Sequence, residues 1–173
     1  NGDLQMKRTC QDFEKYGHIV ALLPEYVDGA GECVVVLYDD GRREVQPRAM
    51  RSTLERCARV FAHSVPLVRD CERQLFGRSR QELPLPLAPY FVLVPFRWRA
   101  PRVRGDTTLA YVNFIHIESF VPERGGIAIL LKGGGRLSIR NTYESAARRF
   151  QDGCASRDHL IAVFCACGLP AIA

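Results

Sequence analysis

The sequence predicts an α+β protein: an antiparallel β-sheet, or a partly open barrel, with two central helices and one or two C-terminal helices. Three observations lead to this fold class. Runs rich in β-branched residues fill the first quarter of the chain and end in turn-forming residues. The apolar spacing changes to a helical period near residue 50, and strand-like runs return after residue 90 before a final helical stretch. We expect the 173 residues to form one domain over 1–173.

The N-terminal quarter is predicted to be a small antiparallel meander. Its strands are expected at 18–23, 32–40 and 42–46. Pro24 is expected to stop the first of them, and Asp40–Gly41 fits a hairpin turn between the other two.

Two helices are predicted in the middle of the chain. Over 50–61, apolar residues recur at i, i+4, i+7, i+8 and i+11, which is one face of a helix. The second helix follows Ser64, has Pro66 in its first turn and ends at Gly77. We expect its buried side to consist of Leu67, Val68, Cys71 and Leu75.

The second half of the chain is predicted to return to strands and then to end in helices. The proline-rich stretch 83–89 does not suit a helix and is expected to break the chain between its halves. A helix capped by Thr142 is expected to end at Gly153, and a separate apolar helix follows at 158–168. Strands, the last two joined by a Gly-rich turn, are predicted at 90–96, 109–120, 127–132 and 136–140.

Positive charge is concentrated in the middle of the chain. The whole chain has a net charge of +5. Residues 1–41 carry −5, residues 42–104 carry +9 and residues 105–173 carry +1. All fourteen cations of the middle segment are arginines, which predicts a basic face that meets an acidic partner such as nucleic acid.

Composition excludes several classes of protein. The chain is 47% apolar and 25% charged, as soluble globular proteins are, and no apolar run approaches the length that crosses a bilayer. The N-terminus lacks the layout of a secretory signal, and the seven cysteines are odd in number with no Cys-x-x-Cys. These features predict a cytoplasmic protein with free thiols and no membrane partner.

No catalytic, metal or cofactor site is predicted. The four histidines lie apart and none belongs to a catalytic motif, so we expect His116 to be structural and the chain not to be an enzyme. Cys154, His159, Cys165 and Cys167 cluster in the sequence, but their spacing fits no common zinc module. We therefore expect these residues to belong to the core.

The segment 97–106 carries the strongest functional signal. It combines four arginines with a tryptophan, namely Arg97, Trp98, Arg99, Arg102 and Arg104. Arginine binds phosphate through a planar fork, and an aromatic ring among arginines can stack on a base or wedge between base steps. The alternative is a solvated hairpin loop with Trp98 folded onto the core. Further DNA contacts are expected from Arg78, Arg80, Arg136 and Arg140.

The order of several short motifs resembles the ComK family, the competence transcription factors of Gram-positive bacteria. The resemblance covers about residues 17–150, leaving the 158–168 helix outside it. The motifs that carry it are GHIVALLPEYVDGAGE (17–32), RDC (69–71), LFGRS (75–79), FVLVP (91–95), YVNFIHIESF (111–120) and LLKGGGRLSIRNTYESAARR (130–149).

This resemblance implies a DNA-binding activator of competence (DNA-uptake) genes. Family members bind paired A/T-rich boxes through the minor groove, act as homodimers that assemble further on DNA, and can be delivered to a Clp protease by an adaptor. The sequence departs from the family in its RWR loop and beyond residue 150, where adaptor recognition is expected to differ.

Two alternative functions remain open on the sequence. One is a protein-interaction module whose basic face meets an acidic partner. The other is a small-molecule sensor or enzyme, which a deep pocket lined by His116 and nearby cysteines would favour.

Overall fold

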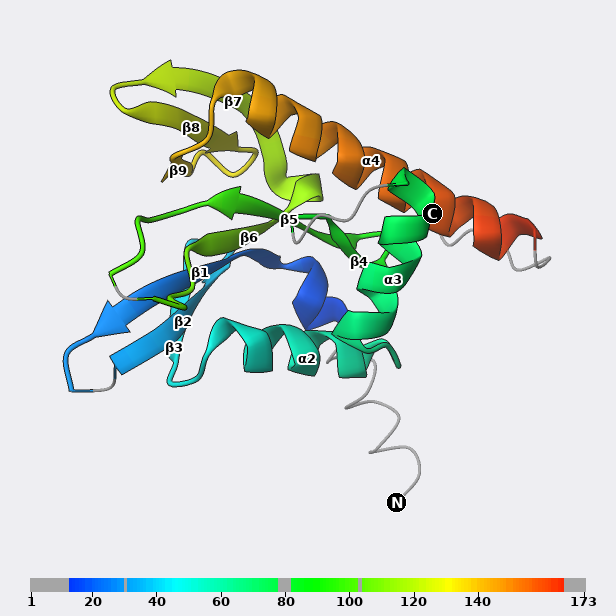
Figure 1. Ribbon diagram of the computed structural model, residues 1–173, viewed down its shortest axis with the longest axis horizontal. Helices are drawn as coiled ribbons and strands as arrows, with labels where there is room; N and C mark the ends of the chain where they lie inside the picture. Colours follow the sequence, from blue (N-terminus) through cyan, green and yellow to red (C-terminus); the bar gives the residue numbers. More distant parts are fainter. Residues whose placement is uncertain (1–12, 30, 78–81, 103, 167–173) are drawn as a thin grey trace.

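The computed structural model describes residues 13–29, 31–77, 82–102 and 104–166, and its elements are stacked in layers (Figure 1). The middle layer is a six-stranded antiparallel sheet in the order β3-β2-β1-β6-β5-β4. Its strands are β1 (Ile19–Val27), β2 (Gly31–Tyr38), β3 (Arg43–Gln46), β4 (Leu85–Ala88), β5 (Phe91–Arg97) and β6 (Leu109–Asn113). The α+β prediction is confirmed, and the described strands form open sheets, with no closed barrel among them.

The predicted N-terminal meander is β1-β2-β3. Gly41 has φ +81° in the β2–β3 turn, where the Arg42 amide donates to Asp40 Oδ1 at 2.9 Å. The expectation that Pro24 stops the first strand is wrong, because β1 continues to Val27. Pro24 pairs with β2, whereas β1 pairs with β6 at Ala21 and Leu22, before the proline. Proline lacks an N–H, and β1 tolerates it at a point where only one neighbouring strand is paired.

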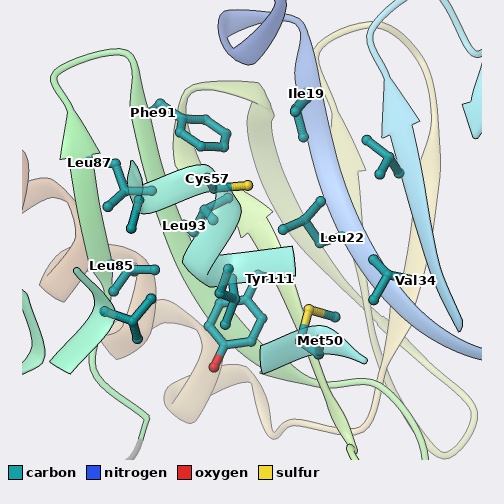
Figure 2. Packing of buried hydrophobic residues seen from close by; sticks show 14 of the residues in the cluster. Ile19, Leu22, Val34, Met50, Cys57, Leu85, Leu87, Phe91, Leu93 and Tyr111 are labelled. Atoms are coloured by element: carbon teal, nitrogen blue, oxygen red, sulfur yellow. The ribbon is translucent and has the colours of Figure 1, made fainter. Parts of the chain in front are cut away.

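Two helices cover one face of the sheet, as Figure 1 shows. They are α2 (Met50–Val60) and α3 (Val65–Phe76), which confirms both predicted helices. Ser64 caps α3 by accepting a hydrogen bond from the Leu67 amide, and Gly77 ends it with φ +60°. The core beneath them combines side chains of α2, such as Met50 and Cys57, with one face of the strands, including Leu22, Leu93 and Tyr111 (Figure 2).

The opposite face of the sheet lies against a second core. This core is closed by a three-stranded sheet of β7 (Ile117–Glu123), β8 (Gly126–Leu131) and β9 (Arg136–Ile139), and by α4 (Tyr143–Ala166). Because side chains alternate across a strand, Val92, Val94 and Phe96 of β5 face this core while Leu93 faces the other. The predicted hairpin at 127–132 and 136–140 is present, because β8 and β9 pair in antiparallel fashion.

Two predictions about the middle of the chain are wrong. Residues 83–89 do not separate two halves, since Leu85–Ala88 form β4, an edge strand where a proline is tolerated. The stretch 109–120 is not one strand, because the short 3-10 helix η1 (Phe114–His116) divides it between the two sheets. His116 lies in this 3-10 helix, and its Nε2 donates to the Gly17 carbonyl at 2.8 Å, the arrangement of a structural histidine.

Gly153 does not end a helix. One continuous helix, α4, replaces the two that we predicted at 142–153 and 158–168. Gly153 is buried where α4 crosses β5, and a Cβ at this position would lie 2.7 Å from Val94 Cγ2. The glycine allows close helix–sheet contact, whereas the sequence suggested a C-cap. Thr142 caps the start of α4, as predicted: its Oγ1 accepts a hydrogen bond from the Ser145 amide at 3.2 Å.

The predicted buried side of α3 is wrong for three of its four residues. Val68 is buried, but Leu67 is 60% exposed, Leu75 is 39% exposed and Cys71 is also exposed. The buried row is Val65, Val68 and Glu72: the two valines join the first core, which includes Leu85 of β4, and Glu72 contacts α4. The buried Glu72 carboxyl group is tolerated at this interface because the Ser156 hydroxyl of α4 donates a hydrogen bond to it.

The prediction that Cys154, His159, Cys165 and Cys167 belong to the core is wrong for most of the residues that the structure describes. Cys154 is half-buried, His159 and Cys165 are exposed, and Cys167 lies outside the described residues. The reason is that α4 passes beyond the sheet after its middle turns, so apolar residues near its end have no core to enter. No helix in the part of the chain that the structure describes is both long and apolar enough to span a membrane.

Candidate nucleic-acid interface

A pocket rich in arginine lies where β5, β9 and the start of α4 meet. It has a volume of about 560 Å³ and is lined by Glu82, Arg97, Arg140, Asn141, Thr142, Ser145, Arg148 and Arg149, which we call the arginine pocket. Arg97 is the last residue of β5, and Arg140 follows β9 directly. Two hydrogen bonds bring these segments together: the Arg140 amide donates to the Arg97 carbonyl, and the Arg97 amide donates to the side-chain oxygen Oδ1 of Asn141, both at 2.7 Å.

Charge in the arginine pocket is positive because one carboxylate faces four guanidinium groups. The side chain of Arg149 is 4% exposed and forms an ion pair with Glu82, and its Nη1 donates to the Pro95 carbonyl at 2.8 Å. Burial lowers the pKa of Arg149, and the Glu82 carboxylate opposes that effect. Arg97 is 62% exposed, with Nη2 3.8 Å from the same carboxylate. Arg140 and Arg148 are exposed as well, so three cations face solvent here.

The start of α4 adds a further positive potential to the arginine pocket. A helix N-terminus presents free amides and the positive end of the helix dipole, and α4 is a 24-residue helix that begins at this pocket. Asn141 orients the entry into the helix, since it donates from Nδ2 to Ser145 Oγ at 3.2 Å. Planar guanidinium groups at such a position have the chemistry to hold a phosphate.

The predicted arginine loop is organised around Asp106. The carboxylate of Asp106 accepts from Arg99 Nη2 at 2.7 Å, from the Arg102 amide at 2.7 Å and from the Tyr26 hydroxyl at 3.0 Å. The Arg102 amide is the main cause of a lowered pKa of Asp106, and Tyr26 and Arg99 contribute. The guanidinium carbons of Arg99 and Arg102 lie 4.4 and 4.6 Å from the centre of the Tyr26 ring. We call this group of four side chains the Asp106 cluster.

Trp98 and Arg99 face the protein, whereas two other loop arginines face solvent. Trp98 is half-buried against the second core, as the alternative interpretation of this loop expected. Arg99 is 16% exposed within the Asp106 cluster. Arg102 and Arg104 are exposed and line a shallow hollow with Pro101, Gly105, Asp106 and Thr108. Of the loop residues we singled out, Arg97, Arg102 and Arg104 are thus open to a ligand.

The remaining predicted residues are dispersed. Arg136 is on β9 and pairs with Glu123 of β7 at 2.6 Å, outside the arginine pocket. Arg78 and Arg80 lie outside the described residues. Arg148 was not among the candidate contacts, although a capped helix start preceded by Arg140 and followed by Arg148 was the signal that could have identified it. A pocket of about 240 Å³ does include His116, but no cysteine lines it.

Removing the Asp106 carboxylate is expected to loosen the arginine loop. In an Asp106→Ala variant, Arg99, Tyr26 and the Arg102 amide lose their common acceptor, so trypsin should cleave after Arg99 and Arg104 roughly tenfold faster than in the wild type. Limited proteolysis with mass spectrometry measures this rate. The control is Asp158→Ala, at an exposed carboxylate of α4. Equal cleavage of the two variants would show that Asp106 does not organise the loop.

Together the fold and this surface define an antiparallel α+β protein with an arginine-lined pocket whose chemistry fits phosphate. Comparison of the chain with protein-family models, curated proteins and solved structures finds no match. The resemblance of residues 17–150 to the ComK family therefore stays a prediction.

Proposed function

We propose that the protein binds double-stranded DNA and regulates transcription, with the arginine pocket as its main phosphate-binding site. The observation that carries this proposal is the convergence of Arg97, Arg140 and Arg148, all exposed, on one pocket at the start of α4. Phosphate contacts supply most of the affinity of DNA-binding proteins, and guanidinium groups suit them. A regular array of phosphates fits a surface with several exposed arginines better than one small anion does.

The exposed loop arginines have a second role in this proposal. Arg102 and Arg104 follow Arg97 by a few residues, and residues 98–102 and 104–108 lie toward the same end of the molecule as the start of α4 in Figure 1. We propose that these two arginines enter a minor groove. An A/T-rich groove is narrow and has a strong negative potential, which attracts arginine without base-specific hydrogen bonds. Trp98 and Arg99 support the loop from within.

The resemblance to the ComK family supports a narrower proposal: the target sites are A/T-rich boxes of competence promoters. In this proposal the DNA-binding surface differs from our initial set of candidates. It includes Arg148, and it leaves Arg99 and Trp98 as supporting residues because both are turned toward the protein.

Neutralising the arginine pocket is expected to weaken DNA binding selectively. A triple variant, Arg97→Ala with Arg140→Ala and Arg148→Ala, should lose roughly 10- to 100-fold in affinity at moderate salt, with a log–log salt slope that is smaller by about 3. The matched control replaces three exposed arginines of α2, namely Arg51, Arg56 and Arg59. It removes the same charge from the opposite side of the sheet, and we expect it to change affinity less than about threefold.

Fluorescence anisotropy with labelled duplexes measures both quantities. Duplexes with paired A/T-rich boxes and scrambled GC-rich duplexes distinguish the two proposed roles, because Arg102→Ala with Arg104→Ala should reduce the preference for A/T-rich sites. Equal losses in the pocket variant and the α2 control, or binding that does not depend on salt, would refute the proposal. Footprinting on competence promoters then tests the choice of target genes.

A further inference from the structure

The guanidinium groups of the arginine pocket have more donors than the protein itself accepts. In the part of the chain that the structure describes, no carboxylate pairs with Arg140 or Arg148. Arg97 has one loose contact, because its Nη2 lies 3.8 Å from Glu82, beyond hydrogen-bonding distance. Arg149 bonds to Pro95 and Glu82 through its two Nη atoms, but its buried Nε has no acceptor among the described residues. Guanidinium groups with unused donors are suited to the oxygens of a phosphate.

The backbone that carries these arginines is held in place. Asn141 is 3% exposed, and it accepts from the Arg97 amide while donating to Ser145 Oγ. The Arg140 amide donates to the Arg97 carbonyl, so the end of β5 is tied to the residue that follows β9. Figure 1 shows β9 leading directly into α4. A ligand that joins the arginines therefore does not have to order a loop first, which lowers the entropic cost of binding.

The arginine pocket has the size and polarity of a site for a small anion. Its volume of about 560 Å³ lies within the range of roughly 300–1,000 Å³ that is typical of small-molecule sites. Every residue that lines it is charged or polar, which disfavours an apolar ligand. Thr142 and Ser145 add hydroxyl groups at the start of α4, where the helix dipole favours negative charge. Glu144 of the same turn does not line the pocket.

The charge of the lining suits two linked phosphate groups better than one. Four guanidinium groups and the Glu82 carboxylate leave a net charge of +3. A single phosphate monoester carries about −1.5 to −2 at pH 7 and compensates only part of this charge. A second phosphate group linked to the first supplies most of the rest, and it gives the separate arginine forks separate sets of oxygens to bind.

We propose that the arginine pocket binds the diphosphate group of a small anion, either a nucleoside diphosphate or pyrophosphate, and that this ligand displaces DNA. Arg97, Arg140 and Arg148 bind the phosphate oxygens, and Thr142 and Ser145 lie beside the phosphate at the start of α4. DNA and the small anion compete because both need the same three exposed arginines. The displacement of DNA rests on the proposed function, whereas binding of the diphosphate group does not.

Isothermal titration calorimetry on the full chain, without DNA or divalent cations, tests the site directly. We expect pyrophosphate and adenosine diphosphate to bind with a Kd on the order of 10–100 µM, and inorganic phosphate to bind at least tenfold more weakly. Equal affinities of the first two ligands would assign the site to the diphosphate group alone. Tighter binding of adenosine diphosphate would show that the nucleoside is bound as well.

Single variants locate the bound anion. Arg140→Ala and Arg148→Ala should each weaken pyrophosphate binding about tenfold. The matched control is Arg51→Ala on α2, an exposed arginine outside the pocket, which should leave the affinity within about twofold of the wild type. All three side chains are exposed, so circular dichroism and the Tm should stay near those of the wild type. Equal losses in Arg148→Ala and Arg51→Ala, or pyrophosphate binding no tighter than inorganic phosphate, would overturn the proposal.

Competition experiments separate this inference from the proposed function. Pyrophosphate at about 1 mM should lower the affinity for a labelled duplex tenfold or more, while sulfate at the same ionic strength should not. If the protein binds pyrophosphate but no duplex, the diphosphate site is supported and the proposed DNA binding is refuted. If duplex binding needs Arg140 and Arg148 but pyrophosphate does not bind, the diphosphate site is refuted and the DNA-binding proposal stands.

Discussion

Arg149→Ala is expected to destabilise the protein by about 3 kcal/mol, because it breaks a buried ion pair at the junction of α4 and β5. The guanidinium of Arg149 joins three segments: it lies on α4, donates to the Pro95 carbonyl of β5 and pairs with Glu82 just before β4. Removal of the side chain leaves the Pro95 carbonyl without its donor, leaves Glu82 with the more distant Arg97 as its remaining cation among the described residues, and opens a cavity in the interface. Urea unfolding, followed by circular dichroism, measures the loss.

Two further variants separate the ion pair from simple packing. Arg149→Lys keeps the charge but cannot bond to Pro95 and Glu82 with one planar group, so we expect an intermediate loss. In a double-mutant cycle, Glu82→Gln should cost much less in the Arg149→Ala background than in the wild type. Additive effects of the two substitutions would mean that Glu82 and Arg149 do not stabilise each other, and that Arg149 acts through packing alone.

Stability is expected to fall as pH rises from about 5 to 8, because Glu72 is buried between α3 and α4. Burial is the main cause that raises the pKa of Glu72 from an ordinary value of 4.5 to about 7, the Asp152 carboxylate adds to it, and the Ser156 hydrogen bond opposes it. The folded protein thus holds a proton that the unfolded chain releases. The protonated carboxyl stabilises the folded state fully below the pKa of Glu72 in the unfolded chain. This stabilisation is lost as pH rises through the pKa of Glu72 in the folded protein, and the unfolding free energy then falls by about 2 to 3 kcal/mol.

Glu72→Gln is expected to remove this pH dependence, since an amide of nearly the same shape has no proton to lose. The difference in unfolding free energy between wild type and variant, measured from pH 5 to pH 8, isolates Glu72 from other groups such as His18, whose pKa is raised by its hydrogen bond to Asp39. Ser156→Ala should move the loss to higher pH, because it removes a donor that stabilises the carboxylate. A difference curve that is flat with pH would refute the assignment.

Local sequence patterns predicted most elements of the fold and placed the ends of α2, α3, β5 and β8 within one residue of those observed. The 3.6-residue period fixed α2, and Ser64 and Gly77 fixed the ends of α3, because caps and periodicity depend on neighbouring residues alone. Pro24 and Gly153 misled for the opposite reason. The missing N–H of Pro24 costs no hydrogen bond where β1 is paired only with β2. Gly153 allows close contact with Val94 of β5 and does not cap a helix. Both outcomes depend on strands that are distant in the sequence.

The sequence predicted an arginine-rich candidate site, but it identified only some of the residues that form this site. The loop at 97–106 was recognisable from its arginines, and three of its five candidate residues are open to solvent. Arg99 and Trp98 could not be assigned from the sequence, because their partners Tyr26 and the second core come from other parts of the chain. The pairing of Arg97 with Arg140 likewise depends on a backbone contact between β5 and the end of β9.

The sequence by itself determined an α+β chain with a strongly basic middle segment, an N-terminal meander and a capped helix at Thr142, since these follow from residue type and short-range spacing. Only the tertiary structure decided which arginines are available to a ligand. It buried Arg149 with Glu82, turned Arg99 onto Tyr26 and brought Arg97 and Arg140 to the start of α4. The physical reason is that exposure and ion pairing depend on contacts across strands, and the local pattern of charges does not encode those contacts.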